Sequence, residues 1–380
     1  MKKLFFIAVA VMAMAACTKK EMNQVVKDNA ITFQTATYLP TSTKASGSVF
    51  ATNKTFGTYA WSDNQLFMNN IEVKYNSNKG QWAPVTVFYW PKNEQTVDFV
   101  SYHPFSDVTV NHVPIVEENK ITYKDIDFSL SANQKDYMYA DKAVGYHDNG
   151  TGEEITDSDN VNTESGLAGV PTLFRHAGAK LAINCTTTYD YLAAAGDTTK
   201  FEITIKQAYL TGIYTKGTCE LNLSDATKTG LVTWNRPANN VWTADENVTN
   251  DPNATMFKIN GTPQLKKGEN VPIMAETYIL PQTLVANQQM LHFIIDAKTY
   301  LKRANETEYT LILEQTEEKN KAIKADISLI MGKISAWEMN GSYEYTIYFG
   351  PASSPITFDP AVVDWKNYEE SSSIELNLTL

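Results

Sequence analysis

The sequence has little of the chemistry on which enzymes and metalloproteins depend. Histidine occurs five times and cysteine three times, and these residues do not have the spacing of an HExxH motif or a zinc site. The nucleophile turn GxSxG and the phosphate-binding loop GxxxxGK[ST] do not occur either. We therefore predict a protein without catalytic residues, metal site or cofactor. A glycosidase is the exception to this reasoning, because its two carboxylates leave no motif.

Arginine and long apolar runs are also scarce. Arginine occurs only at Arg175, Arg236 and Arg303, so a trypsin-like protease acting near the N-terminus would have to cut after lysine. The net charge of -11 opposes binding to nucleic acid and to anionic lipid surfaces. No apolar run after the N-terminal segment is long enough for a transmembrane helix, which needs about 20 residues.

Residues 1–16 have the three parts of an export signal. Two lysines follow the first methionine, residues 4–14 form an apolar run too short to span a bilayer, and small residues precede Cys17. This pattern resembles a bacterial lipoprotein signal, although Met14 stands where leucine is usual. The resemblance implies that Cys17 is acylated and anchors the chain in a membrane. A plain secretory signal is the alternative.

Residues 17–44 are expected to be a polar tether followed by a removable strand. Ile31 and Phe33 alternate with polar residues, as in a strand with one buried face, and a proline ends the pattern in AITFQTATYLPTSTKA. The bond between Lys44 and Ala45 follows among small polar residues, where proteases prefer to cut. We interpret Ile31 and Phe33 as part of a strand that is displaced after cleavage. An ordinary first strand and loop are the alternative.

Residues 45–166 are predicted to form a first β-sandwich. Six short segments are rich in β-branched and aromatic residues and are separated by turn residues. They are FGTYAW, NNIEVKY, WAPVTVFYW, TVDFVSYHPF, DVTVNHV and KITYKDIDFSL. The alternating aromatic residues are expected in the core, although an exposed glycan-binding platform would use the same types. These residues are Trp61, Trp82, Phe88, Trp90, Phe99 and Tyr102.

A polar and acidic stretch, residues 145–169, leads to the second predicted domain, residues 167–380. Its acidic residues lack the glycine and the terminal carboxylate of an EF-hand calcium loop, so we expect a solvated loop between the domains. His176, which follows directly, is interpreted as an interdomain hydrogen-bonding residue. Residues 224–269 are expected to form a long loop or an extra hairpin.

Two pairs of residues in the second region leave alternatives open. Trp234 and Trp242 are either exposed adhesive aromatics or residues that pin the 224–269 segment. Cys185 and Cys219 lie in or at the end of predicted strands. In an exported protein they can form a disulfide, which would stabilise the fold by roughly 3–4 kcal/mol, or they can remain two separate buried thiols.

The C-terminal residues 371–380, SSSIELNLTL, alternate apolar and polar residues up to the last position. Such a pattern predicts a strand with one apolar face, which some other surface must cover. The strand either completes its own domain or is donated to a neighbouring subunit, where it fills the groove that Ile31 and Phe33 vacate. A head-to-tail contact of this kind builds a filament. The apolar residues are Ile374, Leu376, Leu378 and Leu380.

Five segments in order resemble the fimbrillin-like family of Bacteroidetes surface lipoproteins. They are QWAPVTVFYWPKNEQTVDFVSYHPF, QKDYMYA, VPTLFRHAGAKLAI, YILPQTL, and SAWEMNGSYEYTIYFG with PITFDPAVVDW. The resemblance implies an all-β protein with two tandem transthyretin-like β-sandwich domains. It also implies a type V pilus subunit that is exported as a lipoprotein, cut after an N-terminal strand and polymerised by donor-strand exchange. Lys44 stands where arginine is common at the cut.

These features together predict a structural and adhesive pilus subunit on the surface of the outer membrane, and not an enzyme. Its expected partners are other pilin subunits, outer-membrane lipid through Cys17, and a ligand on a host or microbial surface. One alternative is a tip or accessory adhesin, which would accept a strand without donating one. Another is a carbohydrate-binding surface lipoprotein, which would bind a polysaccharide as a monomer.

Overall fold

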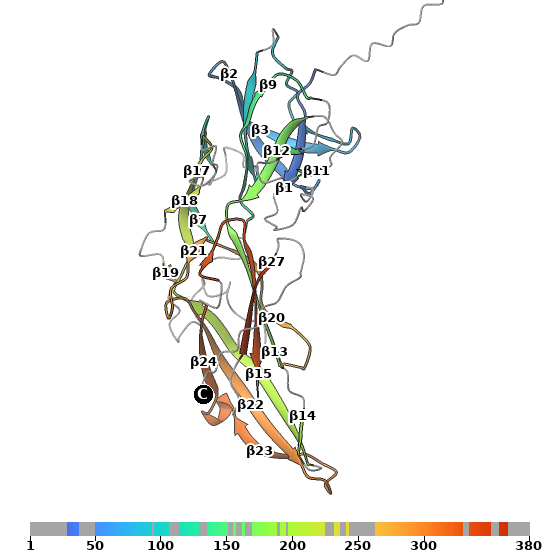
Figure 1. The fold of residues 1–380 in the computed structure, drawn as a ribbon, viewed down its shortest axis with the longest axis vertical. Helices are drawn as coiled ribbons and strands as arrows, with labels where there is room; N and C mark the ends of the chain where they lie inside the picture. The colour runs from blue at the N-terminus through green and yellow to red at the C-terminus, as the bar shows by residue number, and fades with distance from the viewer. Residues whose placement is uncertain are drawn as a thin grey trace, which may run out of the picture.

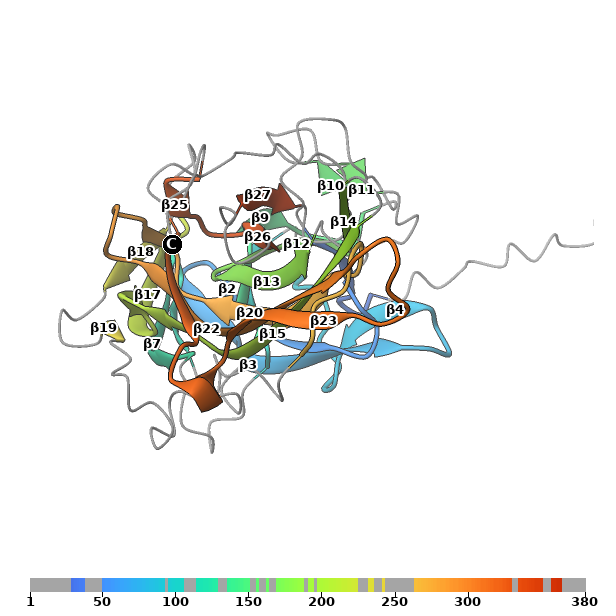
Figure 2. The same ribbon diagram turned by 90° about the horizontal axis from the view of Figure 1, so that it is seen from below.

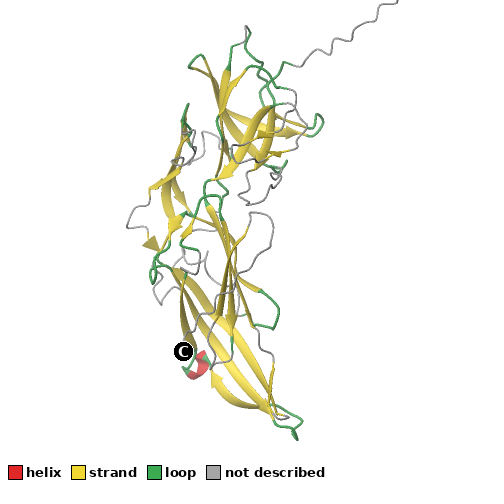
Figure 3. Cartoon of the chain, in the orientation of Figure 1, coloured by secondary structure: helices red, strands yellow, loops and turns green. Residues whose placement is uncertain are grey.

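The computed structural model is an all-β protein, as predicted, and it is elongated (Figure 1, Figure 3). It describes residues 29–37, 50–92, 95–105, 114–128, 135–150, 155–156, 162–163, 169–187, 191–194, 197–224, 232–235, 241–242, 263–329, 334–350 and 357–363. Within these ranges the only helix is one short 3-10 turn, η5 (Glu317–Lys319). None of the helical structure in this part of the chain is long and apolar enough to cross a membrane.

The N-terminal part is one curled sheet of eight strands. Because β2 pairs with both β3 and β5, the sheet returns to its first strand and encloses a core. In order across the sheet, the strands are β2 (Thr55–Ser62), β3 (Gln65–Asn76), β4 (Gln81–Pro84), β1 (Phe33–Thr37), β12 (Val170–His176), β8 (Met138–Ala140), β5 (Val97–His103) and β9 (Ala143–Tyr146).

Aromatic residues fill the space inside this sheet, as the alternation in the sequence predicted. Trp82, Trp90 and Phe99 are buried in this core, and Tyr102 is buried on the other face of β5 in a separate cluster; each is at most 3% exposed. Trp61 and Phe88 are half-buried and pack against the core clusters. These aromatics therefore stabilise the fold by packing and do not form an exposed platform.

The chain leaves the first sheet later than the sequence indicated. β12 follows the predicted boundary at residue 166, yet it pairs in parallel with β1 along its length. Because β12 supplies the hydrogen-bonding partner for one edge of β1, it belongs to the N-terminal sheet. The next strand, β13 (Ala179–Thr187), belongs to another sheet. The crossing between the two lies at Ala177 and Gly178.

A second sheet joins the two halves of the chain. Strand β7 from the N-terminal half pairs antiparallel with β17 from the C-terminal half. A separate hydrophobic cluster, which includes Tyr102, Tyr123 and Leu280, packs beside this sheet. Its strands, in order, are β18 (Val232–Asn235), β17 (Lys216–Asn222), β7 (Lys120–Asp127) and β6 (Ile115–Glu117).

The C-terminal part consists of two sheets (Figure 2). They share a hydrophobic core that includes Leu181, Ile205, Phe293 and Ile347. One sheet has the order β20 (Val271–Ile279), β13, β26 (Ser342–Phe349) and β27 (Thr357–Val363). The other contains β14 (Tyr191–Ala194), β15 (Asp197–Thr211), β22 (Met290–Lys302) and β23 (Thr310–Gln315), with β24 (Ile323–Ser328) also on β22.

Three two-stranded pairs complete the described elements. They are β10 (Ile155–Thr156) with β11 (Asn162–Thr163), β16 (Ile213–Tyr214) with β19 (Val241–Trp242), and β21 (Gln282–Thr283) with β25 (Ala336–Trp337).

Candidate functional site

Strand β1 occupies an interior position in the N-terminal sheet. It pairs in parallel with β12 from Phe33 opposite Val170 to Thr37 opposite Phe174. On its other side it pairs with β4, where Phe33 lies opposite Trp82. The removal of β1 would therefore open the sheet between β4 and β12 and leave two unpaired strand edges facing each other.

The two predicted strand residues, Ile31 and Phe33, lie in the core. Their exposed fractions are 1% and 0%. The ring of Phe33 packs edge-on against Phe56 and Phe99, with centroid separations of 5.5 Å and 5.6 Å. Edge-to-face packing of this kind adds to the gain from burial, so Phe33 is the main apolar anchor of β1.

The prediction that β1 has one solvent-facing side is wrong. All five residues of the strand are buried, and the exposed fractions of Thr32 and Gln34 are only 6% and 2%. The chain around Asn149 and Gly169 packs against the strand. The alternation of residue types does not show that segments distant in sequence bury the second face of a strand.

The side chain of Asn149 binds the main chain of the residues just before β1. Its Oδ1 accepts hydrogen bonds from the main-chain N–H of Thr32, at 3.0 Å, and from Nε1 of Trp90, at 3.1 Å. Its Nδ2 donates to the main-chain oxygen of Ala30, at 2.7 Å. The sequence offered no signal for this role, because Asn149 followed by glycine indicates only a turn.

The segment after β4, residues 88–90, contacts the chain just before β1. The main-chain N–H of Ile31 donates to the oxygen of Phe88, at 2.8 Å, and that of Trp90 donates to the oxygen of Asn29, at 3.1 Å. Ala30 forms an antiparallel bridge with Tyr89. Residues 29–37 are thus paired over their whole described length.

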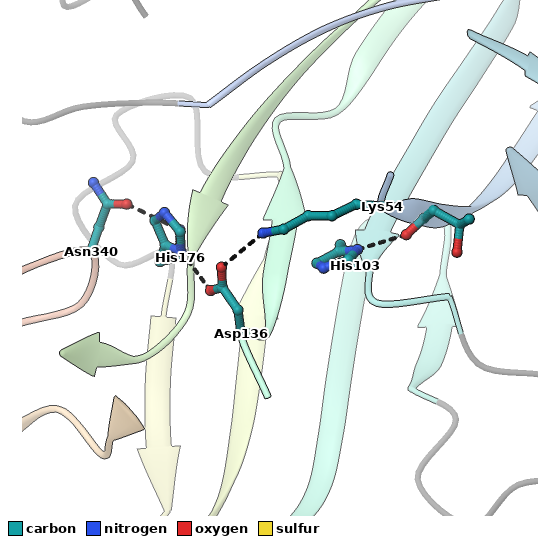
Figure 4. Close-up of polar contacts among 6 residues, drawn as sticks. Lys54, His103, Asp136, His176 and Asn340 are labelled. Atoms are coloured by element: carbon teal, nitrogen blue, oxygen red, sulfur yellow. Dashed lines mark hydrogen bonds and ion pairs between the residues drawn. The ribbon is translucent and has the colours of Figure 1, made fainter. Parts of the chain in front are cut away.

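A polar cluster lies where β12 leaves the N-terminal sheet (Figure 4). Nδ1 of His176 lies 2.6 Å from Oδ1 of Asp136, and Nζ of Lys54 lies 3.3 Å from Oδ2. The main-chain N–H of His176 donates to Oδ1 of Asn340, whose own N–H donates to the oxygen of Gly178. Because Asn340 lies two residues before β26 (Ser342–Phe349), these bonds connect the two parts. The predicted interdomain hydrogen bond of His176 is therefore present, but its main-chain N–H makes it, while the imidazole binds Asp136 within the N-terminal part.

Burial sets the protonation states in this cluster. It lowers the pKa of His176 although Asp136 favours the charged imidazole. Burial by itself would raise the pKa of Asp136, but the hydrogen bond from His176 and the charge of Lys54 lower it below its ordinary value. At neutral pH a neutral imidazole therefore donates to a carboxylate, with Lys54 as the countercharge. Burial also lowers the pKa of His103 to about 4, and its Nδ1 donates to the oxygen of Thr55 at 2.6 Å.

Of the two alternatives left open for Cys185 and Cys219, the structure shows two separate buried thiols and no disulfide between them. Cys185 on β13 belongs to the C-terminal core, whereas Cys219 on β17 belongs to the cluster beside the second sheet. Two side chains in separate cores cannot reach the short distance that a disulfide requires. Burial raises the pKa of both thiols, which makes them unreactive.

Of the two alternatives for Trp234, an exposed aromatic or a residue that pins the 224–269 segment, the structure shows the second. It is partly buried against the cluster beside the second sheet, and its Nε1 donates to the main-chain oxygen of Ala177 at 3.2 Å. Trp234 therefore pins the segment to the crossing between the two parts. Trp242 lies in β19, which pairs with β16.

The remaining predicted site residues lie outside the described part of the chain. They are the lipidation residue Cys17, the cleavage residues Lys44 and Ala45, and the donor-strand residues Ile374, Leu376, Leu378 and Leu380. Among the described residues, no group of three or more His, Cys, Asp or Glu side chains could hold a metal ion.

Comparisons with known proteins place the fold in context. A family model described as fimbrillin-like matches residues 43–365. The chain is similar to a fimbrial protein from Bacteroides vulgatus, at 12% identity and a TM-score of 0.50, covering 89% of this chain and 99% of that one. It is also similar to a candidate cell adhesion protein from Bacteroides uniformis, at 17% identity and a TM-score of 0.43, covering 89% and 100%. None of the curated proteins matches.

Proposed function

The chain belongs to the fimbrillin-like family, and on this premise we propose that it is a structural and adhesive subunit of a surface pilus. It is exported as a lipoprotein acylated at Cys17 and displayed on the outer membrane. Its two parts correspond to two tandem transthyretin-like sandwiches. The fimbrial protein from Bacteroides vulgatus, which shares the fold, supports this proposal.

The interior position of β1 is the observation that carries the proposal. The strand is paired with β4 and β12, yet in sequence it is joined to the rest of the sheet only through the stretch that contains Lys44. Cleavage after Lys44 would leave β1 held by non-covalent contacts alone. A strand whose departure opens a closed sheet leaves a site with the shape and the hydrogen-bonding groups of one strand.

An empty β1 position would be energetically unfavourable. The loss of Phe33 and Ile31 from the core costs about 1.5–3 kcal/mol of hydrophobic stabilisation for each side chain. The facing edges of β4 and β12 also lose their hydrogen-bonding partner. A second strand with alternating apolar residues would restore both the buried apolar surface and the hydrogen bonds to β4 and β12. Residues 371–380 of a neighbouring copy have that pattern.

Substitution of the donor strand tests this function. Leu376→Asp together with Leu378→Asp should abolish polymers of the cleaved protein, because carboxylates cannot enter an apolar core without a large cost. The cleaved monomer should remain folded, as measured by circular dichroism. If the double variant unfolds the monomer, residues 371–380 belong to its own core, and the subunit is a tip or accessory adhesin.

A further inference from the structure

Asn149 contacts the main chain just before β1, and Gly169 contacts the main chain of β1 itself. The carboxamide of Asn149 binds the oxygen of Ala30 and the N–H of Thr32. On this side of the chain the next partner is the parallel strand β12, and these are the two groups that one residue of such a parallel neighbour would bind. The side chain of Asn149 therefore takes the place of a strand partner for the residues just before β1.

Gly169 permits the second close approach. A methyl group on its Cα would lie 2.7 Å from the carbonyl carbon of Phe33 and 2.9 Å from the nitrogen of Gln34. Both atoms belong to the main chain of β1. The N–H of the next residue, Val170, donates to the oxygen of Thr32 at 2.8 Å. The fit at Gly169 therefore depends on the path of the strand and not on its side chains.

The orientation of Asn149 is fixed by groups that do not belong to β1. Nε1 of Trp90 can only donate, so the atom of Asn149 that faces it must be the oxygen. The main-chain oxygen of Asn149 accepts a hydrogen bond from the N–H of Gly169 at 2.7 Å. Both anchors remain after β1 leaves, so the carboxamide stays aimed at the vacant position.

We propose that Asn149 and Gly169 form a main-chain clamp that binds an extended peptide strand at the β1 position, including the strand of a second copy of this chain. This inference rests on the proposed function, because it requires β1 to leave. The clamp accepts any residue at the positions of Ala30 and Thr32 except proline at the latter, which has no N–H. Selectivity comes from the next position, where Phe33 requires an apolar replacement.

A double-mutant cycle with a synthetic peptide tests the clamp. The full chain is cut with trypsin and incubated with a fluorescent peptide of residues 28–38. In a second peptide an ester replaces the amide between Ile31 and Thr32, which removes the N–H that Asn149 binds; the weaker acceptor strength of the ester carbonyl is the same in both proteins and cancels in the cycle. We expect the ester to weaken binding about 3- to 10-fold in the wild type and to have almost no effect in Asn149→Ala.

Two controls isolate the contact. An ester at the amide of Thr35, which Asn149 does not bind, should weaken binding equally in both proteins. Asn69→Ala, at an exposed position on β3, should behave as the wild type. Asn149→Asp keeps the acceptor and loses the donor, so it should retain the penalty of the Thr32 ester and keep the cycle informative if Asn149→Ala folds poorly. An equal penalty of the Thr32 ester in wild type and Asn149→Ala overturns the clamp.

The clamp and the proposed function fail in different ways. If no peptide enters the cut protein, the β1 position is not vacated and the proposed function is contradicted. The clamp is then decided in the uncut chain by hydrogen exchange. Asn149→Ala should accelerate exchange of the Thr32 amide at least about 10-fold relative to that of Thr35. Equal exchange of Thr32 in the two proteins overturns the clamp.

Discussion

Gly169 and Phe33 are in contact through their main chains, so closely that a Cβ at position 169 would lie 2.7 Å from the carbonyl carbon of Phe33. The three atoms nearest to such a Cβ all belong to β1. A side chain at this position would therefore collide first with the main chain of β1.

Gly169→Ala should consequently destabilise the intact chain and not the body that has lost β1. We expect a loss of about 1–3 kcal/mol in the free energy of unfolding, as for other overpacked sites. Urea unfolding of the uncut chain measures this loss. The same titration of the trypsin-cut body, after removal of the β1 fragment, should give equal midpoints for variant and wild type. A loss of similar size in both forms would mean that Gly169 serves the sheet as a whole.

Limited trypsin treatment of the folded chain should yield a stable body that begins at Ala45. The body is rich in paired strands, whereas the bond after Lys44 lies in a polar stretch between two strands. N-terminal sequencing of the product measures the cut. Lys44→Gln should protect the chain at this position, and a body that begins elsewhere in the wild type would contradict the assignment.

His103 should make the protein less stable in acid. Burial lowers its pKa to about 4, below the ordinary value of about 6.5. The unfolded chain therefore binds this proton more tightly than the folded one, and stability falls as the pH drops from about 6.5 to about 4. The total loss from this group is about 3 kcal/mol.

His103→Gln retains a donor for the oxygen of Thr55 and removes the titration. Urea unfolding at pH 7 and pH 4.5 should show a smaller difference between the two pH values for the variant than for the wild type. His176, whose pKa burial also lowers, keeps part of the acid sensitivity in both proteins. Identical pH dependence of the two proteins would exclude a contribution from His103.

Cys17→Ala should release the protein from the membrane. The variant retains the apolar run of the signal and loses the sulfur and the new N-terminus that lipid modification requires. Radiolabelled fatty acid should appear in the wild type and not in the variant, and the variant should be unanchored, with its export or processing impaired. Equal labelling of both would rule out Cys17 as the lipidation site.

The sequence predicted the strand on which the proposed function rests, but not the residues that surround it. Alternation identifies Ile31 and Phe33 as buried, because a half-buried strand has period 2. The hydrogen bond between Thr32 and Asn149 spans 117 positions of sequence, and no local pattern encodes such a contact. The burial of Gln34 was missed for the same reason, since long-range packing covers it.

The boundary and the cysteines show the same limit of local patterns. The segment VPTLFRH has the period of a strand whichever sheet it joins, so its parallel pairing with β1 was not apparent. The number of residues between Cys185 and Cys219 likewise does not indicate whether the two side chains lie in the same core. Both outcomes depend on topology, which brings together segments that are distant in sequence.

The central claim is that the β1 position receives the C-terminal strand of a neighbouring copy, and cysteine crosslinking tests it most directly. Pro171 on β12 lies opposite Gln34 and is half-buried. Chains that carry Pro171→Cys together with Glu375→Cys, Asn377→Cys or Thr379→Cys are cut with trypsin, polymerised, oxidised and separated without reductant. The account predicts a ladder of covalent multimers for at least one pair, and none in uncut chains. Polymers that yield no ladder with any pair, or crosslinks confined to single chains, would contradict it.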